Sequence, residues 1–460
     1  MNTATTLKAI VLSALLLGFS AFVATDAQAQ RSTAQVSGMI SVDHTIDSTG
    51  DYSGIGVAIV HFNPAESVLD TLFYETTDVN GMFSGTARFN NRNDYVISIT
   101  RNQRLISTST VVLADGDDIN MSAEIPGFSE SFRAESVENT AVNDFRRVER
   151  NFNRVVDFIN SGYSEVTQDT IPVILRTWSD LYWSIQDTHP NTLAAESGTL
   201  RSIEVIQGWD DELVLRRAKQ GLREMSDFKS ERASIAADAI TRIDGLDAGV
   251  AFIDSVRTLD ISEDDHIILE MRKIELLTEH DQNERALRYL SDFRQKYGDD
   301  STLNQWADIY QFDIENLSKG LPVPEFSILL QDERTLSNTD FEGKYLLIEV
   351  VNLASGRYMT DHTLLSFIYE DVKDEVQFLT IPTTESPITI RAFYEERPTS
   401  WPVAKSRQVH SAGLMDKLNV VVQPTRLLVA PDGTIVRKYS GTDLSVIEND
   451  IKTLLNEDPS

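Results

Sequence analysis

The sequence contains no cysteine. Thiol–disulfide exchange requires a thiolate that attacks a disulfide sulfur, so the chain by itself cannot perform that reaction. Disulfide bonds and a cysteine-linked lipid anchor are excluded for the same reason, although disulfides are common in exported proteins. The stability of the fold must therefore come from packed cores, for which 460 residues are ample.

Basic residues are also scarce. The chain has 41 lysines and arginines against 71 aspartates and glutamates, a formal net charge of −30. This balance argues against nucleic acid and anionic membranes as partners, because both repel an acidic surface. Only 12 of the basic residues are lysines. Such a composition fits a protein from a saline habitat, where salt screens self-repulsion, and it fits an ordinary acidic secreted protein as well.

Long apolar runs are absent beyond the N-terminus. Lys8 precedes the apolar run 10–23, and Ala27-Gln28-Ala29 matches a signal-peptidase cleavage site. The run is shorter than the roughly 20 residues of a membrane-spanning helix. We therefore predict a cleavable signal peptide over 1–29, export to the periplasm or out of the cell, and no transmembrane segment in the mature chain.

Short strands are predicted in the first part of the mature chain. The stretches 36–42, 56–62 and 95–100 alternate loosely between β-branched and other residues, and turn residues separate them. This spacing predicts a small antiparallel β-sandwich over 33–127. The run Thr77–Phe83, followed by a strand that begins at Tyr95, resembles the carboxypeptidase-regulatory-like or transthyretin-like sandwich. The resemblance implies a non-catalytic spacer or docking domain.

Acidic turn residues of this region offer oxygen atoms to a cation such as Ca²⁺; they are Asp47, Asp51, Asp115, Asp117 and Asp118. None belongs to a loop of EF-hand type. We interpret them as solvated turn acids and predict no metal site and no cofactor.

From Val137 the apolar period becomes helical. Amphipathic stretches begin at Val137 and after Thr170, and continue at about 210–226, 231–243, 247–258, 263–279, 282–297 and 301–318. Short connectors between them predict a helical bundle or a short solenoid over 137–320. The aromatic residues Trp178, Tyr182 and Trp183 fit a core better than a binding groove. His266 and His280 lie on different segments and do not indicate a metal site.

The last part of the chain, 321–457, alternates strands and helices. Strands are expected at 326–330, 345–351, 376–380, 418–422, 425–430 and 435–439, and helices at about 359–370, 405–417 and 443–455. This order predicts an α/β fold with a mixed sheet. The whole chain is therefore expected to be multidomain, with an N-terminal β-sandwich, an α-helical middle and a C-terminal α/β domain.

Four motifs of the last domain resemble exported thioredoxin-like proteins of the TlpA/ResA type, within the AhpC/TSA-like group. They are Gly320-x-Pro-x-Pro-x-Phe326, Phe341-x-Gly-Lys-Tyr-x-Leu-x-Glu349, Trp401-Pro-Val403 and the run Val421–Val436 with Pro424-Thr425. The resemblance implies a thioredoxin-like fold, a cis bond before Pro424, and a Cys-x-x-Cys pair after the strand 345–351. Val429 and Ala430 stand where the family has Ile and Asp.

The positions of that cysteine pair are degenerate here. They read Ser355-Gly356-Arg357-Tyr358, so the resemblance implies the fold without the redox chemistry. In an active member the edge beside the cis proline binds the extended backbone of a substrate. Gln423, Pro424 and Thr425 are therefore a candidate edge for binding a peptide by strand addition. Alternatively, the loop and the proline are relics of the fold.

We interpret the protein as a secreted, redox-inactive thioredoxin-like module that binds or assembles a protein or peptide partner of the bacterial envelope. No catalytic residue is predicted. Three alternatives remain: an oxidoreductase by membership only, an enzyme that uses Ser355, His362 and Arg357, and a purely structural envelope protein. For the second alternative His362 is poorly placed, since it lies about two helical turns beyond Ser355.

Overall fold

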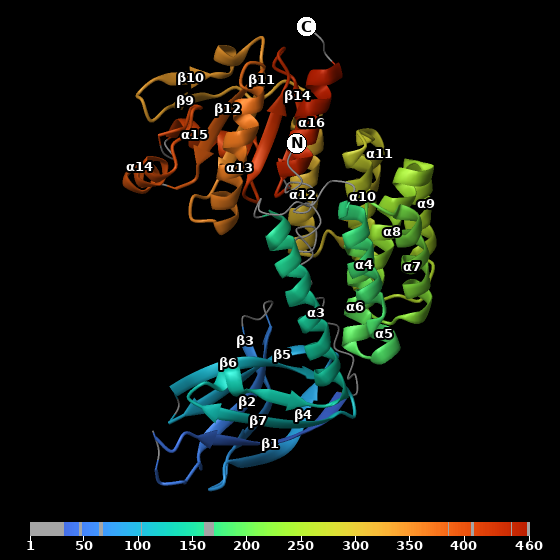
Figure 1. The fold of residues 1–460 in the computed structure, drawn as a ribbon. Helices are drawn as coiled ribbons and strands as arrows, with labels where there is room; N and C mark the ends of the chain where they lie inside the picture. The colour runs from blue at the N-terminus through green and yellow to red at the C-terminus, as the bar shows by residue number, and fades with distance from the viewer. Residues whose placement is uncertain are drawn as a thin grey trace. The chain divides into compact units, whose positions relative to one another are not determined.

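The computed structural model describes residues 32–45, 48–63, 68–102, 104–160, 170–384, 386–405, 409–442 and 444–457 (Figure 1). The predicted signal peptide and Asp47 lie outside these residues. The chain divides into two compact units, one formed by the described residues up to Ile267 and one by those from Ile268 onward. The division falls within a helix of the predicted helical middle. The three domains drawn from the sequence, 33–127, 137–320 and 321–457, stay a prediction.

The β-rich part of the first unit consists of two four-stranded sheets that share one core, as Figure 1 shows. Their strand orders are β4-β1-β7-β8 and β3-β2-β5-β6. Strand β1 pairs antiparallel with β4 and parallel with β7, and its alternate residues are buried. The strands are β1 (Ser32–Val42), β2 (Ile55–Asn63), β3 (Val68–Thr76), β4 (Met82–Phe89), β5 (Asn93–Arg101), β6 (Arg104–Leu113), β7 (Asp118–Ile125) and β8 (Arg133–Glu135), with the short helix α2 (Phe128–Ser131).

The turn before β4 explains the residue types of the Thr77–Phe83 motif. Thr77 Oγ1 accepts the N–H of Ile55 (3.0 Å) and donates to the carbonyl of Tyr52 (2.6 Å). Gly81 has a φ of +80°, and a Cβ atom there would lie 2.2 Å from the carbonyl oxygen of Ile40. Only glycine meets both conditions without strain.

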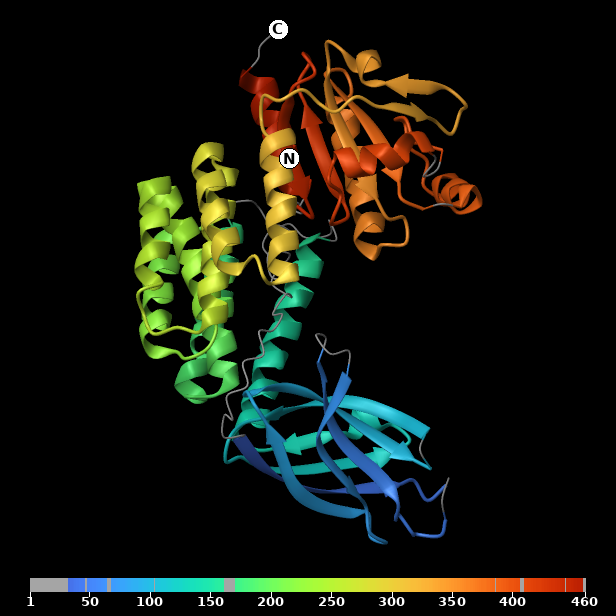
Figure 2. The ribbon, with the colours of Figure 1, turned by 180° about the vertical axis from the view of Figure 1, so that it is seen from behind.

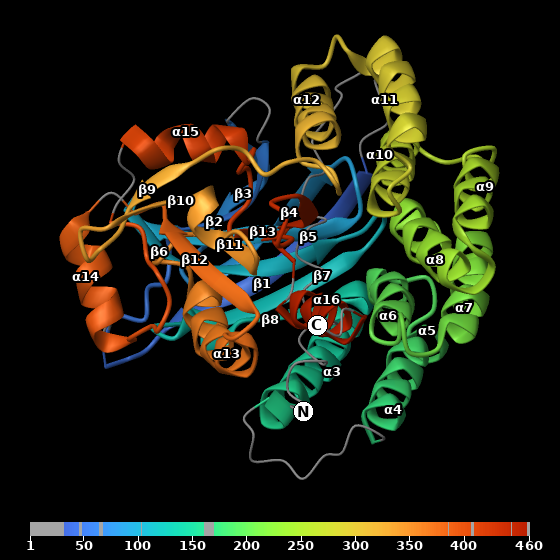
Figure 3. The ribbon, with the colours of Figure 1, turned by 90° about the horizontal axis from the view of Figure 1, so that it is seen from above.

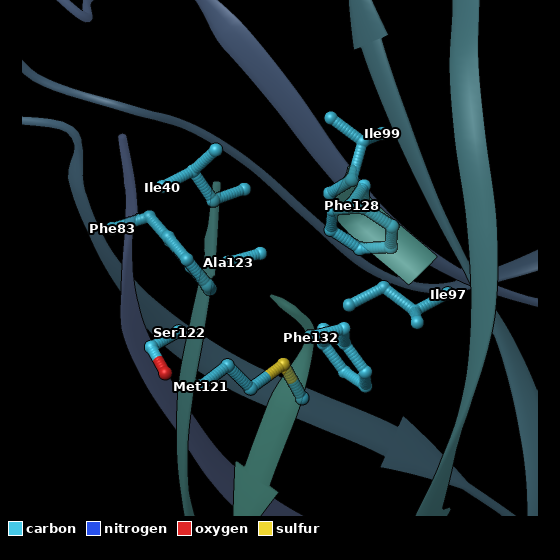
Figure 4. A pocket seen from close by; sticks show the side chains of 9 residues that line it. All are labelled: Ile40, Phe83, Ile97, Ile99, Met121, Ser122, Ala123, Phe128 and Phe132. Carbon is cyan, nitrogen blue, oxygen red and sulfur yellow. The ribbon is translucent and has the colours of Figure 1, made fainter. Parts of the chain in front are cut away.

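A small void lies in the core between the two sheets (Figure 4). Its lining is apolar except for one serine, and it is too small to hold a water molecule; the lining residues are Ile40, Phe83, Ile97, Ile99, Met121, Ser122, Ala123, Phe128 and Phe132. An apolar space of this size is a packing gap rather than a ligand site.

The helical part of the first unit follows directly after β8. Its helices are α3 (Val137–Asn160), α4 (Ile171–Trp183), α5 (Ile185–Thr188), α6 (Leu193–Glu204), α7 (Asp211–Glu224), α8 (Lys229–Asp244) and α9 (Leu246–Val256), and α10 (Glu263–Glu279) crosses the division between the units. The expected helices are confirmed within a few residues. Helix α6 was missed because it buries polar side chains, among them Glu196 and Arg201, which removes the apolar period.

One arginine joins the β-sandwich to these helices. Arg92, in the turn between β4 and β5, donates to Asp227 (2.6 Å), to Glu138 on α3 (3.3 Å) and to the carbonyl of Asn191 (2.9 Å). Burial lowers and these carboxylates raise the pKa of Arg92, and the net effect is a raised pKa. The sandwich and the helices of this unit are therefore held by a charge-assisted contact.

The second unit holds a four-stranded mixed sheet in the order β12-β11-β13-β14. Strands β11 and β12 are parallel, whereas β13 is antiparallel to both β11 and β14. The elements are α11 (Asn283–Tyr297), α12 (Ser301–Asn316), β9 (Ser327–Leu329), β10 (Thr335–Ser337), η3 (Asn338–Phe341), β11 (Tyr345–Val351), α13 (Gly356–Val372), β12 (Val376–Pro382), α14 (Pro387–Glu396), α15 (Val409–Lys417), β13 (Thr425–Val429), β14 (Ile435–Ser440) and α16 (Leu444–Glu457).

Helices cover both faces of this sheet (Figure 3). One face packs on α13, α14 and α16, and the other packs on α15 and on the C-terminal part of α12. Both faces of β11 are buried, which explains its uninterrupted apolar run.

One expectation for this unit was wrong, and one helix was missed. The stretch 418–422 is not a strand, because the chain leaves α15 through a turn and joins no ladder before Thr425. Helix α14 was not expected.

Candidate functional site

Ser355–Tyr358, which sequence analysis aligned with a Cys-x-x-Cys pair and which we call the degenerate loop, lies where β11 gives way to α13. Ser355 is the residue before the first turn of α13, and its Oγ accepts the N–H of Tyr358 (3.5 Å). The serine hydroxyl therefore caps the helix. Gly356 is exposed, and the side chain of Arg357 lies outside what the structure describes.

Tyr358, which sequence analysis aligned with the second cysteine position, has a fully buried ring. Its hydroxyl donates to Glu349 Oε1 (3.1 Å) and lies 3.2 Å from the hydroxyl of Tyr394. Burial, followed by the nearby charge of Glu349, raises the pKa of Tyr358 well above its usual range. The phenol thus stays protonated and acts as a hydrogen-bond donor to the carboxylate beneath it.

Glu349 is the centre of a buried polar network. Its Oε1 also accepts from the hydroxyl of Thr380 (2.6 Å), which in turn accepts from the indole N–H of Trp401 (2.8 Å). Arg426 donates to Glu349 Oε2 (3.2 Å) and to Asp361 on α13 (3.0 Å). The carboxylate oxygens of Glu349 thus have protein partners, as buried charges require.

Sequence analysis did not identify this network. A signal was present, because one acid and one arginine interrupt the apolar runs Tyr345–Val351 and Thr425–Val429. The register places Glu349 directly opposite Arg426 on neighbouring strands. That register cannot be read from one sequence, since it depends on turns and packing elsewhere.

His362 is buried among aromatic rings. The ring centroids of Tyr358, Phe393, Tyr394 and Trp401 lie 5.7–6.0 Å from that of His362. Its Nε2 atom has no hydrogen-bond partner in the described residues. Burial, and then the charge of Arg397, lower the pKa of His362.

The enzyme alternative based on Ser355 gains no support from this geometry. A nucleophilic serine needs a base within hydrogen-bonding reach. The described contacts of Ser355 include its helix cap but no bond to His362, whose ring points into the aromatic shell. The candidate residues are thus brought into one region without forming a nucleophile–base pair.

The three residues of the candidate peptide edge differ in burial. The Gln423–Pro424 bond is cis. Pro424 and Thr425 are buried, and Thr425 begins β13, where it pairs with Val350. Gln423 is exposed, and its Oε1 accepts from the hydroxyl of Thr383 (3.0 Å).

The exposed residues before Pro424 have backbone N–H groups without a partner in the described residues, whereas the carbonyl of Val422 accepts the hydroxyl of Thr425. Val421 and Val422 are 58% and 38% exposed, and with Gln423 they form what we call the 421–423 segment. In the part of the chain that is described, no hydrogen bond uses a backbone N–H of this segment. The β-branched residues that predicted a strand here therefore form a strand-like sequence without a partner strand.

The other candidate residues lie elsewhere. Tyr182 is fully buried and donates to Glu149 (2.7 Å), and its ring and that of Trp178 pack on Phe152, as a core position requires. Among the described residues, no group of three or more histidines and acids is placed to hold a metal ion. Nor does any helix formed by those residues have the length and apolarity needed to cross a membrane.

The sheet order, with two parallel strands followed by an antiparallel pair, is that of a thioredoxin-like fold. The chain is similar to the thioredoxin domain of a thiol-disulfide oxidoreductase from Bacteroides vulgatus, with 22% identity and a TM-score of 0.27 over 30% of this chain and 97% of that one. It is also similar to a thiol:disulfide interchange protein from Bacteroides sp. (22%, TM-score 0.28, 30% and 91%) and a thiol-disulfide oxidoreductase from Bacteroides fragilis (19%, TM-score 0.26, 29% and 99%). No family model and no curated protein matches the chain.

Proposed function

We propose that the protein is an exported, redox-inactive thioredoxin-like protein that binds an extended segment of a partner protein along its 421–423 segment. In this proposal the C-terminal domain is of the TlpA/ResA type without the cysteine pair, and the N-terminal domain is a carboxypeptidase-regulatory-like sandwich that serves as a spacer or docking domain. The observation that carries the proposal is an exposed, β-branched segment whose backbone N–H groups have no described partner.

Strand addition fits this segment better than a pocket does. The unpaired N–H groups of this exposed segment can donate to the carbonyl groups of an extended peptide, while exposed side chains provide selectivity. The exposed faces of Val421 and Val422 favour apolar side chains in the partner. Gln423 adds a side-chain amide next to them, held by Thr383.

The absence of redox chemistry is part of the proposal. The positions of the thiol pair hold a helix-capping serine and a buried tyrosine, and the chain has no cysteine. Binding of a peptide at this end of the sheet would thus not lead to a covalent step. The net charge of −30 favours a partner with basic residues near the bound segment, because opposite charges accelerate encounter.

The proposal is tested by selecting peptide ligands. Phage-displayed random dodecapeptides are panned on residues 30–460, and the dissociation constant of a selected peptide is measured by fluorescence anisotropy. Gln423→Pro removes one backbone N–H, and Val421→Lys changes the apolar surface. Each is expected to weaken binding about ten-fold, which corresponds to the loss of about one good contact.

The matched control is Ile388→Lys, since Ile388 is 79% exposed on α14 of the same unit. It removes a similar apolar surface and is expected to leave the dissociation constant unchanged. The proposal fails if no peptide is selected, or if Gln423→Pro and Val421→Lys both bind the peptide as tightly as the parent and the control do.

A further inference from the structure

Helix α12 holds the chain immediately before the 421–423 segment. After α15 ends at Lys417, the chain turns at Asn419, whose φ is +46°. The side-chain amide of Asn419 donates to the carbonyl of Ile309 and to Asp313 Oδ1, both on α12, at 2.9 Å each. Asparagine tolerates this left-handed backbone better than most residues, so the turn and its side-chain bonds reinforce each other.

A lysine of β14 completes the contact. Lys438 Nζ donates to both oxygens of Asp313 at 2.7 Å and to the carbonyl of Asn419 at 3.1 Å. The Lys438 side chain is 9% exposed. Three elements, α12, the turn and β14, thus meet at a charged contact two residues before Val421. The ribbon in Figure 2 shows α12 running alongside the C-terminal sheet.

We infer that Asn419 is a positioning residue for peptide binding, and that α12 belongs to the binding apparatus through Asn419 and Asp313. This inference rests on the proposed function. A segment with no ladder of its own is ordered chiefly by what anchors its ends, here in addition to the bond from Thr383 to the side chain of Gln423. One end is anchored by Pro424, whose carbonyl accepts the N–H of Gly441 (2.9 Å), and the other by Asn419 on α12. An ordered segment binds a strand at a smaller entropic cost than a mobile one.

The test uses residues 30–460 and a dodecapeptide selected on the parent protein. Asn419→Gly keeps a residue that accepts the left-handed backbone but removes both side-chain bonds to α12. We expect it to weaken peptide binding about ten-fold, in line with the loss of two neutral or charge-assisted hydrogen bonds that order the segment. A second variant, Asp313→Leu with Lys438→Met, removes both partly buried charges together and is expected to weaken binding similarly.

Two controls separate positioning from general loss of stability. Asn316→Ala removes an amide from the same helix whose one bond within the described residues is to its own turn, at the carbonyl of Phe312, and this variant is expected to bind the peptide normally. Ile447→Val lowers stability from the core on the opposite face of the sheet and is also expected to leave the dissociation constant unchanged.

The second readout does not require a ligand. Backbone ¹⁵N relaxation is measured for residues 421–423 in the free protein. We expect backbone order parameters of about 0.85 in the parent and below about 0.6 in Asn419→Gly. Unchanged order parameters in Asn419→Gly overturn the inference whether or not a peptide binds. Unchanged affinity in both Asn419→Gly and the double variant overturns it as well, whereas failure of the parent to bind any peptide counts against the proposed function.

Discussion

Glu349 and Arg426 lie directly opposite each other on β11 and β13, and Arg426 Nε donates to Glu349 Oε2 across 3.2 Å. Both side chains are almost completely buried beneath the degenerate loop, with exposed fractions of 2% and 1%. A buried ion pair contributes little net stability, but removing one partner leaves an uncompensated charge. Removing either Glu349 or Arg426 alone is thus expected to destabilise the region beneath the loop.

Replacing the arginine is expected to be severe. Arg426→Met leaves Glu349 and Asp361 without a shared cation, and we expect a loss of about 3–5 kcal/mol in the free energy of unfolding. The measurement is denaturant-induced unfolding. Arg437→Met serves as the control, because Arg437, on β14 of the same sheet, forms a half-exposed ion pair with Asp450 of α16. This substitution is expected to cost less than about 1 kcal/mol. Equal losses in the two variants would contradict this assignment.

Removal of one hydroxyl is expected to destabilise the loop region. Tyr358→Phe keeps the buried ring but deprives Glu349 of one donor, and we expect a loss of about 1–3 kcal/mol in the free energy of unfolding. Tyr74→Phe is the comparison, since Tyr74 is 58% exposed on β3. A Tyr358→Phe variant as stable as the parent would show that the network does not depend on this phenol.

Single cysteines introduced at the two degenerate positions are expected to differ in reactivity. Ser355→Cys places a thiol at the N-terminus of α13, where the helix favours the thiolate, and Tyr358→Cys places one in the buried interior. In a chain without other cysteines, Ellman's reagent reports each thiol alone. We expect Ser355→Cys to react at least about ten-fold faster. Equal rates would mean that position 358 is accessible.

Stability is expected to fall with decreasing pH through the titration of His362. Its pKa is lowered in the folded protein, so the unfolded chain binds the proton first. The contribution of this group is fully present above the unfolded pKa of about 6.5 and is lost as the pH falls from there toward the folded pKa, with a slope of at most about 1.4 kcal/mol per pH unit.

The difference between the parent and His362→Phe isolates this group from all others. Urea unfolding is measured for both between pH 7.5 and 5. The stability of the parent relative to the variant is expected to decline below about pH 6.5. If the difference in unfolding free energy between the parent and His362→Phe did not change with pH, the titration of His362 would make no contribution to stability.

The turn before β4 is expected to tolerate no Cβ atom. Gly81→Ala combines a positive φ with a clash against the carbonyl of Ile40, so we expect a loss of about 2–4 kcal/mol. Gly50→Ala is the control, because Gly50 has a similar φ of +70° and open space around it, and it is expected to cost about 1–2 kcal/mol. Thermal unfolding is measured for both variants, and the difference between their losses in stability gives the contribution of the clash.

The sequence predicted those elements best whose local pattern agrees with their surroundings. Strand β11 matches the apolar run Tyr345–Val351 because both of its faces are buried. The stretch 418–422 has strong β propensity, but bonds from Asn419 to α12 take the chain out of the sheet. There, tertiary contacts overrode local preference.

The candidate site was predicted only in outline. Alignment of motifs placed Ser355 and Tyr358, because both lie at fixed distances from a recognisable strand. The partners of Tyr358 and His362 come from separate elements, among them α14 and Trp401. Their meeting depends on the fold as a whole, and no local spacing in the sequence records it.

The buried ring of Tyr358 has an evolutionary consequence. A cysteine at that position would remove a donor from Glu349 and leave a gap against Phe393, while position 355 still held a serine without redox activity. A cysteine at position 358 alone would thus lower the stability of the fold before a thiol pair was complete.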